Sequence, residues 1–161
     1  MITAEHVKKQ FDKVLAVDDV TVTIKEQEVF GLIGTNGAGK STFLRMVSGI
    51  LKPDRGEILV DERKVYENPK AKADIFYIPD EQYFLPNATP KDMARFYKDF
   101  YPKFDMPRFD EMLARFQLKA RRKVNTFSKG MKKQLSVLLG VCANTKYMLC
   151  DETFDGLDPV M

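Results

Sequence analysis

One eight-residue segment constrains this chain more than any other feature of its sequence. Residues 34–41 read Gly-Thr-Asn-Gly-Ala-Gly-Lys-Ser and match the pattern G-x-x-x-x-G-K-[ST]. The apolar run at 29–33 predicts a buried strand before it, and residues 40–48 read as a helix that ends near Gly49. A glycine-rich turn between a strand and a helix is the context in which this pattern binds phosphate. A chance glycine-rich turn is the alternative, and it leaves these flanking elements unexplained.

The residue types in this loop fit the chemistry of a bound nucleoside triphosphate. Backbone N–H groups must converge on phosphate oxygens, and glycines leave room for that approach. Lys40 brings a positive charge to the β- and γ-phosphates, and Ser41 offers a hydroxyl to Mg²⁺. A GTPase is expected to carry an Asn-Lys-x-Asp motif that reads the base, which the nearest segment, residues 144–147, does not match. We therefore expect ATP and Mg²⁺ as the ligands.

Short strands dominate the first 85 residues and return near the end of the chain. Apolar residues alternate with polar ones over 20–24, which predicts a half-buried antiparallel strand. Apolar runs at 57–60, 75–78 and 147–150 predict three more strands, and the last of them ends in two carboxylates. This order predicts an α/β fold with a mostly parallel sheet, whose ligands bind at the carboxyl ends of the strands.

The segment from Pro86 to about Asn144 has a helical pattern. Thr89 and Asp92 are spaced for a capping interaction at a helix start, with proline at the first helical position. Apolar residues over 109–116 follow the i, i+3, i+4, i+7 spacing of an amphipathic helix. Ser128 is placed to cap a further helix.

Two further positions are candidates for phosphate chemistry. Asp151 ends the apolar strand at 147–150, which suits a carboxylate that binds Mg²⁺ directly or through water. Glu152 is the next residue and is placed to orient a water for attack on the γ-phosphate. Ser128 and Gly130 at a helix start form a candidate second anion site, for which an ordinary N-cap is the alternative.

Composition narrows the classes of protein and of partner. Lys and Arg number 26 and Asp and Glu number 23, so the formal net charge is only +3, and we expect no nucleic-acid partner. The two cysteines exclude a disulfide scaffold and are expected to be buried small hydrophobes. The first residues lack the pattern of a secretory signal, and the longest apolar stretch, 137–143, is far shorter than a membrane span. We therefore expect a soluble, cytoplasmic protein.

Taken together, these elements resemble the nucleotide-binding domain of ABC-type ATPases over the whole chain and in the family's order. Residues 34–42 look like its Walker A motif, and Phe-Ser-Lys-Gly-Met at 127–131 resembles its signature motif. Residues 147–152 look like Walker B with the catalytic glutamate, and residues 153–158 resemble the segment that ends in the D-loop. The resemblance implies an α/β fold with a P-loop NTPase (RecA-like) core, an N-terminal antiparallel β subdomain and a helical subdomain.

The resemblance also implies a division of the chain and a set of site residues. The β-rich part and P-loop core would cover 1–85, the helical subdomain 86–145, and Walker B with the D-loop 146–161. Glu152 would be catalytic, and the implied Mg²⁺ residues are Ser41, Asp151 and Asp80. The implied nucleotide-binding residues are Phe11, Gly34, Thr35, Asn36, Gly37, Ala38, Gly39, Lys40, Ser41, Thr42, Ser128, Gly130 and Asp158. Phe11 would stack on adenine, with a buried core phenylalanine as the alternative.

Two positions depart from the family's pattern. Asp80 stands where the family has its Q-loop glutamine, and Gln82 lies two positions too far along. The family's switch histidine would follow the D-loop, whereas the only histidine here is His6, near the start. We therefore expect a domain that is incomplete at its C-terminus. Such a domain would expose apolar sheet surface and associate with other copies of itself. We also expect it to bind Mg²⁺-ATP but to hydrolyse ATP with severely impaired activity.

The leading functional hypothesis is the ATP-binding and hydrolysing subunit that energises an ABC transporter, of the exporter type. The family implies a membrane permease subunit and a second nucleotide-binding domain as partners, identical or different, paired head to tail. It also implies a peripheral location on the inner face of the cell membrane. A soluble ABC-type ATPase acting on nucleic acid or ribosomes is the alternative. The 88 positions from Lys40 to Ser128, which hold no heptads, and the single domain disfavour it.

Overall fold

A computed structural model describes residues 1–153 of the chain. The segment 154–161, which includes Asp158 of the expected D-loop, lies outside the described residues. The chain divides into two compact units, residues 1–74 and residues 75–161. Each unit has its own sheet and its own helices.

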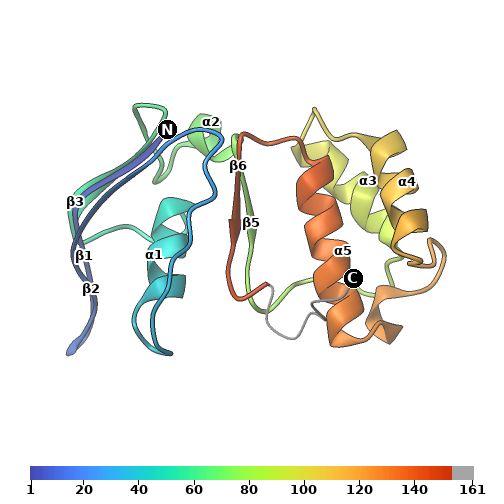
Figure 1. The fold of residues 1–161 in the computed structure, drawn as a ribbon, viewed down its shortest axis with the longest axis horizontal. Coiled ribbons are helices and arrows are strands. Elements are labelled where there is room, and N and C mark those ends of the chain that lie inside the picture. The colour runs from blue at the N-terminus through green and yellow to red at the C-terminus, as the bar shows by residue number, and fades with distance from the viewer. Residues whose placement is uncertain (154–161) are drawn as a thin grey trace. The chain divides into compact units, whose positions relative to one another are not determined.

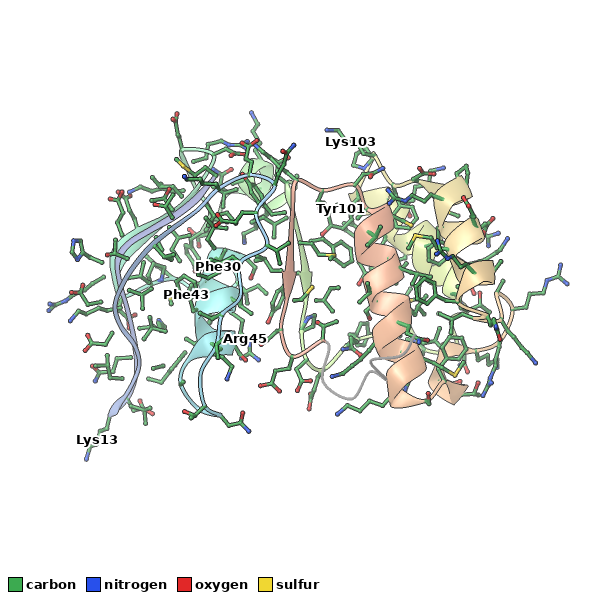
Figure 2. The ribbon with its side chains drawn as sticks, in the orientation of Figure 1. Lys13, Phe30, Phe43, Arg45, Tyr101 and Lys103 are labelled. Atoms are coloured by element: carbon green, nitrogen blue, oxygen red, sulfur yellow. The ribbon has the colours of Figure 1, made fainter. Side chains whose placement is uncertain are left out.

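The first unit contains a four-stranded antiparallel sheet with the strand order β2-β1-β3-β4. Its strands are β1 (Ile2–Phe11), β2 (Val14–Ile24), β3 (Arg55–Val60) and β4 (Arg63–Lys64). β1 and β2 form a long hairpin in which Phe11 pairs with Val14, and Figure 2 shows Lys13 extending from its tip. Burial alternates over the last residues of β2, so the half-buried antiparallel strand predicted at 20–24 is confirmed.

Helix α1 (Lys40–Val47) packs against one face of this sheet (Figure 1). Its buried residues are Phe43, Met46 and Val47. Gly49 follows the helix with a φ of 71°, so the prediction of a glycine at this helix end is confirmed. A second, short helix in this unit is α2 (Pro69–Lys72).

The second unit contains a parallel pair of strands, β5 (Ile75–Ile78) and β6 (Tyr147–Cys150). Its helices are α3 (Pro90–Phe100), α4 (Met106–Arg115) and α5 (Lys129–Cys142), and the 3₁₀ helix η1 (Val124–Thr126) precedes α5. The three longer helices lie on the same side of the strand pair (Figure 1). The predicted strands at 75–78 and 147–150 and the predicted helix start at Ser128 are confirmed.

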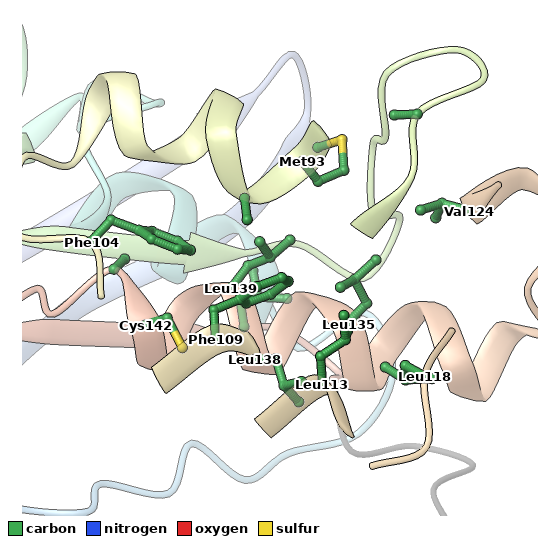
Figure 3. Close-up of a cluster of buried hydrophobic side chains, with 14 of the residues drawn as sticks. Met93, Phe104, Phe109, Leu113, Leu118, Val124, Leu135, Leu138, Leu139 and Cys142 are labelled. Atoms are coloured by element: carbon green, nitrogen blue, oxygen red, sulfur yellow. The ribbon is translucent and has the colours of Figure 1, made fainter. Parts of the chain in front are cut away.

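The core of the second unit lies among its helices and strands (Figure 3). Phe109 and Leu113, two members of the predicted apolar helix face, are buried there, whereas Phe116 at the end of α4 is partly exposed. Burial raises the pKa of the Cys142 thiol to about 11, so this side chain stays protonated at neutral pH and packs as a small hydrophobe. The other labelled residues of Figure 3 are Met93, Phe104, Leu118, Val124, Leu135, Leu138 and Leu139.

Helix α5 approaches the strand pair closely at Gly140. A Cβ atom at this position would lie 2.9 Å from Met148 Sδ and 3.0 Å from Phe76 Cδ1. Tyr101, just after α3 (Figure 2), donates a hydrogen bond from its hydroxyl to Ile75 O at 3.2 Å. Its ring centroid lies 5.3 Å from that of Phe76. A small residue and an aromatic cluster therefore set how closely the helices pack on the strands.

The start of α3 has the capping interaction predicted from its sequence. Asp92 N donates to Thr89 Oγ1 at 3.3 Å, and Thr89 N donates to Asp92 Oδ2 at 2.9 Å. These reciprocal bonds satisfy two backbone donors that a helix start otherwise leaves without a partner. The Thr89 hydroxyl also donates to Asp92 Oδ2 at 2.7 Å. This bond, followed by the one from Thr89 N, lowers the pKa of the Asp92 carboxyl, because both bonds favour its charged form.

The predicted buried strand at 29–33 is wrong. These residues form no strand in the structure, and the side chain of Ile33 is 96% exposed. A buried strand needs neighbouring strands to accept its hydrogen bonds and to cover its side chains. Within residues 1–153, β1 to β4 pair with one another and β5 pairs with β6, so this apolar run has no partner strand. In the same residues, the expected parallel sheet is limited to β5 and β6.

Thr89→Ala is expected to lower the free energy of unfolding by about 1 kcal/mol, since it removes the N-cap of α3. The difference from the wild type should shrink as the pH falls below about 4. The reason is that the lowered pKa of Asp92 gives stability above the ordinary carboxyl pKa, and this stability is lost as Asp92 is protonated. Urea denaturation at several pH values measures both effects. Thr89→Ser keeps the hydroxyl and should remain close to the wild type.

Gly140→Val is expected to destabilise the chain by roughly 1–3 kcal/mol, because the added atoms overlap Met148 and Phe76. The midpoint of urea denaturation measures this change. Lys132→Val, on a less buried face of α5, reports the cost of valine in a helix without the overlap. Equal effects of the two substitutions would contradict a close approach at Gly140.

Candidate functional site

The phosphate loop leads directly into α1, and its glycines adopt conformations that other residues avoid. Gly37 and Gly39 have φ angles of 83° and 85°. A Cβ atom on Gly39 would overlap the carbonyl oxygen of Ala16 on β2. The loop is closed by a hydrogen bond from Ala38 N to Thr35 O at 3.2 Å. The third glycine of the motif is therefore required both by its backbone conformation and by the closeness of β2.

The charge at the start of α1 favours an anion. Lys40 Nζ donates hydrogen bonds to Gly34 O at 2.8 Å and to Thr35 O at 3.0 Å, which holds the ammonium over the loop. No side chain caps the first turn of α1, and that turn contains no acidic residue. Ser41 and Thr42 lie in this turn. The helix dipole and the ammonium together make the loop suited to phosphate oxygens.

A mainly apolar cleft of about 330 Å³ lies beside the phosphate loop. Gly39 and Lys40 form part of its wall, and its apolar lining comes from β2, the 29–33 run, the phosphate loop and α1. These apolar lining residues are Ala16, Val17, Val20, Val22, Phe30, Leu32, Ile33, Ala38 and Phe43. Figure 2 labels Phe30 and Phe43 in this part of the first unit.

Phe11 lies at the end of β1 and is not one of the residues that line this cleft. Its side chain is 44% exposed, and Lys9 Nζ lies 5.4 Å from the centroid of its ring. The alternative of a buried core phenylalanine is therefore wrong. An exposed ring at this position is accessible to a stacking partner.

Asp151 lies in the second unit, directly after β6. Its side chain is only 2% exposed, and its backbone N–H donates to Ile78 O at 2.9 Å. Tyr77 on β5 donates a hydrogen bond from its hydroxyl to Asp151 Oδ2 at 3.1 Å. Sequence reasoning did not select Tyr77. The signal for it is the parallel register of β5 and β6, which a single sequence does not supply.

The structure also brings a lysine to Glu152 and Asp80. Lys133 on α5 is 1% exposed, and its Nζ donates to the backbone oxygen of Glu152 at 2.7 Å. The same Nζ lies 3.9 Å from Asp80 Oδ1, in the loop after β5. Gln82 donates to the carbonyls of Pro79 and Asp80, within its own loop. Asp80, Asp151 and Glu152 thus lie in the loops that follow the carboxyl ends of β5 and β6.

Ser128 caps α5 in the ordinary manner. Its hydroxyl accepts a hydrogen bond from Met131 N at 3.2 Å, and Gly130 lies in the first turn of the helix. That turn contains no acidic residue. Ser128 is therefore an ordinary N-cap, which was the alternative to an anion site. The second anion site at Ser128 and Gly130 stays a prediction.

Mg²⁺ fits the residues that are present. It is usually held by one or two carboxylates together with phosphate oxygens, rather than by a cage of protein ligands. Among residues 1–153 no group of three or more His, Cys, Asp or Glu side chains is placed to hold a metal. Asp151 is a buried carboxylate at a strand end, and Ser41 follows the phosphate loop. Ser41 belongs to the first unit and Asp151 to the second.

In the described part of the chain, no helix combines the length and the apolar character needed to cross a bilayer.

Comparison with known proteins gives consistent matches. A family profile described as "ABC transporter" matches residues 17–155. The ABC transporter ATP-binding protein YtrB of Bacillus subtilis is 37% identical over 160 residues, which cover 99% of this chain and 55% of YtrB. The lipopolysaccharide export system ATP-binding protein LptB of Haemophilus influenzae is 30% identical over 169 residues, covering 99% of this chain and 70% of LptB. The chain therefore spans about half the length of YtrB and somewhat more of LptB.

Solved structures have the same fold. An ATP-binding subunit of an ABC transporter aligns with a TM-score of 0.87 at 24% identity, covering 99% of this chain and 69% of the other. A dimeric ATP-binding cassette in a post-hydrolysis state, bound to ADP and phosphate, aligns with a TM-score of 0.84 at 24% identity, covering 99% of this chain and 77% of the other. Together with the phosphate loop before α1 and the carboxylates after β6, these matches show that the chain belongs to the ABC transporter family of ATP-binding proteins, with its P-loop NTPase fold.

Proposed function

We propose that this chain binds and hydrolyses ATP to energise an exporter-type ABC transporter. The phosphate loop is the observation that carries the proposal, because its ammonium and its uncapped helix start suit a triphosphate. LptB is named as part of a lipopolysaccharide export system, which favours export over import. The transported substrate would be recognised by the permease. The alternative of a soluble ATPase acting on nucleic acid or ribosomes has no support from the names of these relatives.

The roles of the residues follow from their chemistry. The loop residues 34–42 would hold the phosphates of ATP through backbone N–H groups, with Lys40 balancing their charge. Ser41 and Asp151 would hold Mg²⁺, and Asp80, in the loop after β5, would bind it through water. The bound Mg²⁺ would neutralise charge on the β- and γ-phosphates. Phe11 would stack on the adenine, since its ring is exposed at the end of β1.

Glu152 would accept a proton from the attacking water and orient it toward the γ-phosphate. This carboxylate is exposed and follows the buried Asp151 at the end of β6, so it is open to a water molecule there. Ser128 and Gly130 would contact the ATP held by a second nucleotide-binding domain, as would Asp158. The N-terminus of α5 suits such a contact because its dipole attracts an anion.

The proposed partners are a membrane permease subunit and a second nucleotide-binding domain, identical or different, paired head to tail. One solved cassette of this fold is described as dimeric. The chain would then be cytoplasmic and peripheral on the inner face of the cell membrane. We retain the division into 1–85, 86–145 and 146–161 as the functional parts of this domain. We also propose impaired turnover for this chain, because His6, its only histidine, lies on β1 and pairs with Asp19.

Lys40→Ala is expected to weaken ATP binding severely. The variant loses a charged hydrogen-bond donor worth about 1.5–3 kcal/mol, which is roughly a tenfold to hundredfold change in affinity. Titration of the purified chain with a fluorescent ATP analogue measures the dissociation constant. Lys70→Ala, an exposed lysine on α2, is the matched control and should bind like the wild type. Unchanged affinity in Lys40→Ala would reject the phosphate loop as the ATP site.

Glu152→Gln is expected to leave ATP binding intact and to lower phosphate release on the order of 100-fold or more, because the amide no longer accepts a proton. Single-turnover phosphate release and the ATP dissociation constant separate the two effects. Glu111→Gln, an exposed glutamate on α4, serves as the control. Normal turnover in Glu152→Gln would remove Glu152 from this role. Robust turnover by the unmodified 161-residue chain would overturn the proposed impairment.

A further inference from the structure

Lys133 is the most deeply buried charged residue among residues 1–153, with only 1% of its surface exposed. It lies in the second turn of α5, five residues after the N-cap Ser128. A buried ammonium is costly unless its surroundings compensate its charge and its N–H groups. An apolar residue of similar length would fill this position without that cost. The functions assigned above to the phosphate loop and the carboxylates make no use of Lys133.

The contacts of Lys133 connect it to the two loops that carry the candidate carboxylates. Its Nζ donates to the backbone oxygen of Glu152 at 2.7 Å, a short bond from a charged donor. The nearer carboxylate oxygen of Asp80 lies 3.9 Å away, and the Asp80 side chain is 45% exposed. The first contact is therefore a firm hydrogen bond to the peptide, and the second is a looser attraction between charges.

The backbone of Glu152 needs such support. Its φ angle is 48°, in the left-handed region that residues other than glycine rarely occupy. Residues remain in such conformations only when their surroundings hold them there, and they cluster at functional sites. The conformation of this residue sets the direction in which its carboxylate leaves the backbone.

We propose that Lys133 is a positioning residue for ATP hydrolysis. Its ammonium holds the carbonyl of Glu152, and thereby keeps the carboxylate aimed at the attacking water, while Asp80 keeps the ammonium at the ends of β5 and β6. The proposal rests on the proposed function of Glu152. Because Ser128 begins the same helix, a shift of α5 on contact with nucleotide at Ser128 would move the group that holds Glu152. Lys133 thus links the signature segment to the catalytic carboxylate.

Lys133→Met and Lys133→Arg test this role on the purified chain. Methionine keeps the length of the side chain and removes the donor, whereas arginine keeps a charged donor. Lys98→Met, an exposed lysine on α3, controls for the substitution itself. Four quantities are measured for each variant: the thermal midpoint, the amide hydrogen exchange of residues 151–153 without nucleotide, and kcat and KM for residual ATP turnover.

Lys133→Met should exchange the amides of residues 151–153 at least tenfold faster than the wild type while its thermal midpoint stays within a few degrees. Its kcat should fall at least tenfold with KM for ATP unchanged within about twofold, because Lys133 is not part of the phosphate loop proposed to hold ATP. Lys133→Arg should recover most of both losses. Unchanged exchange in Lys133→Met, or a loss that Lys133→Arg does not recover, would overturn the proposal. A wild type that does not bind ATP would reject the proposed function instead, and the exchange measurement would still decide whether Lys133 holds Glu152.

Discussion

The parallel pairing of β5 with β6 is the constraint on which the candidate catalytic site of the second unit depends. Ile78 pairs with Cys150, so the loops that follow the two strands leave the pair at the same end. Parallel strands require a crossover between them, and here it contains α3, α4 and α5. The register therefore brings Asp80 to Asp151 and Glu152, although about 70 residues separate them in the chain.

Buried polar groups complete this strand end. The carboxylate of Asp151 is almost fully buried and accepts a hydrogen bond from Tyr77, and the buried ammonium of Lys133 donates to the backbone of Glu152. Each of these groups would be costly to bury alone, because water no longer satisfies it. The hydrogen bonds from Tyr77 to Asp151 and from Lys133 to Glu152 offset this cost and fix the positions of these groups. Such a geometry is what phosphoryl transfer needs, since its catalysis is mainly positioning and charge stabilisation.

Much of the fold could be predicted from local pattern. The helix start at Thr89, the cap at Ser128 and the glycine after α1 each depend on neighbours within a few residues, and all three are confirmed. The strand at 29–33 was predicted from its apolar run alone, and that prediction is wrong. An apolar run becomes a strand only when other strands pair with it, and no local property of residues 29–33 supplies those partners.

The sequence by itself determined the phosphate loop, the order of the motifs and the membership of the ABC transporter family, because these depend on residue type and spacing. Only the tertiary structure decided that Tyr77 contacts Asp151 and that Lys133 reaches Glu152. The first contact follows from the register of two strands, and the second from the packing of α5 in the same unit as the strand pair. Both join residues far apart in the chain, and a local pattern contains no information on such distances.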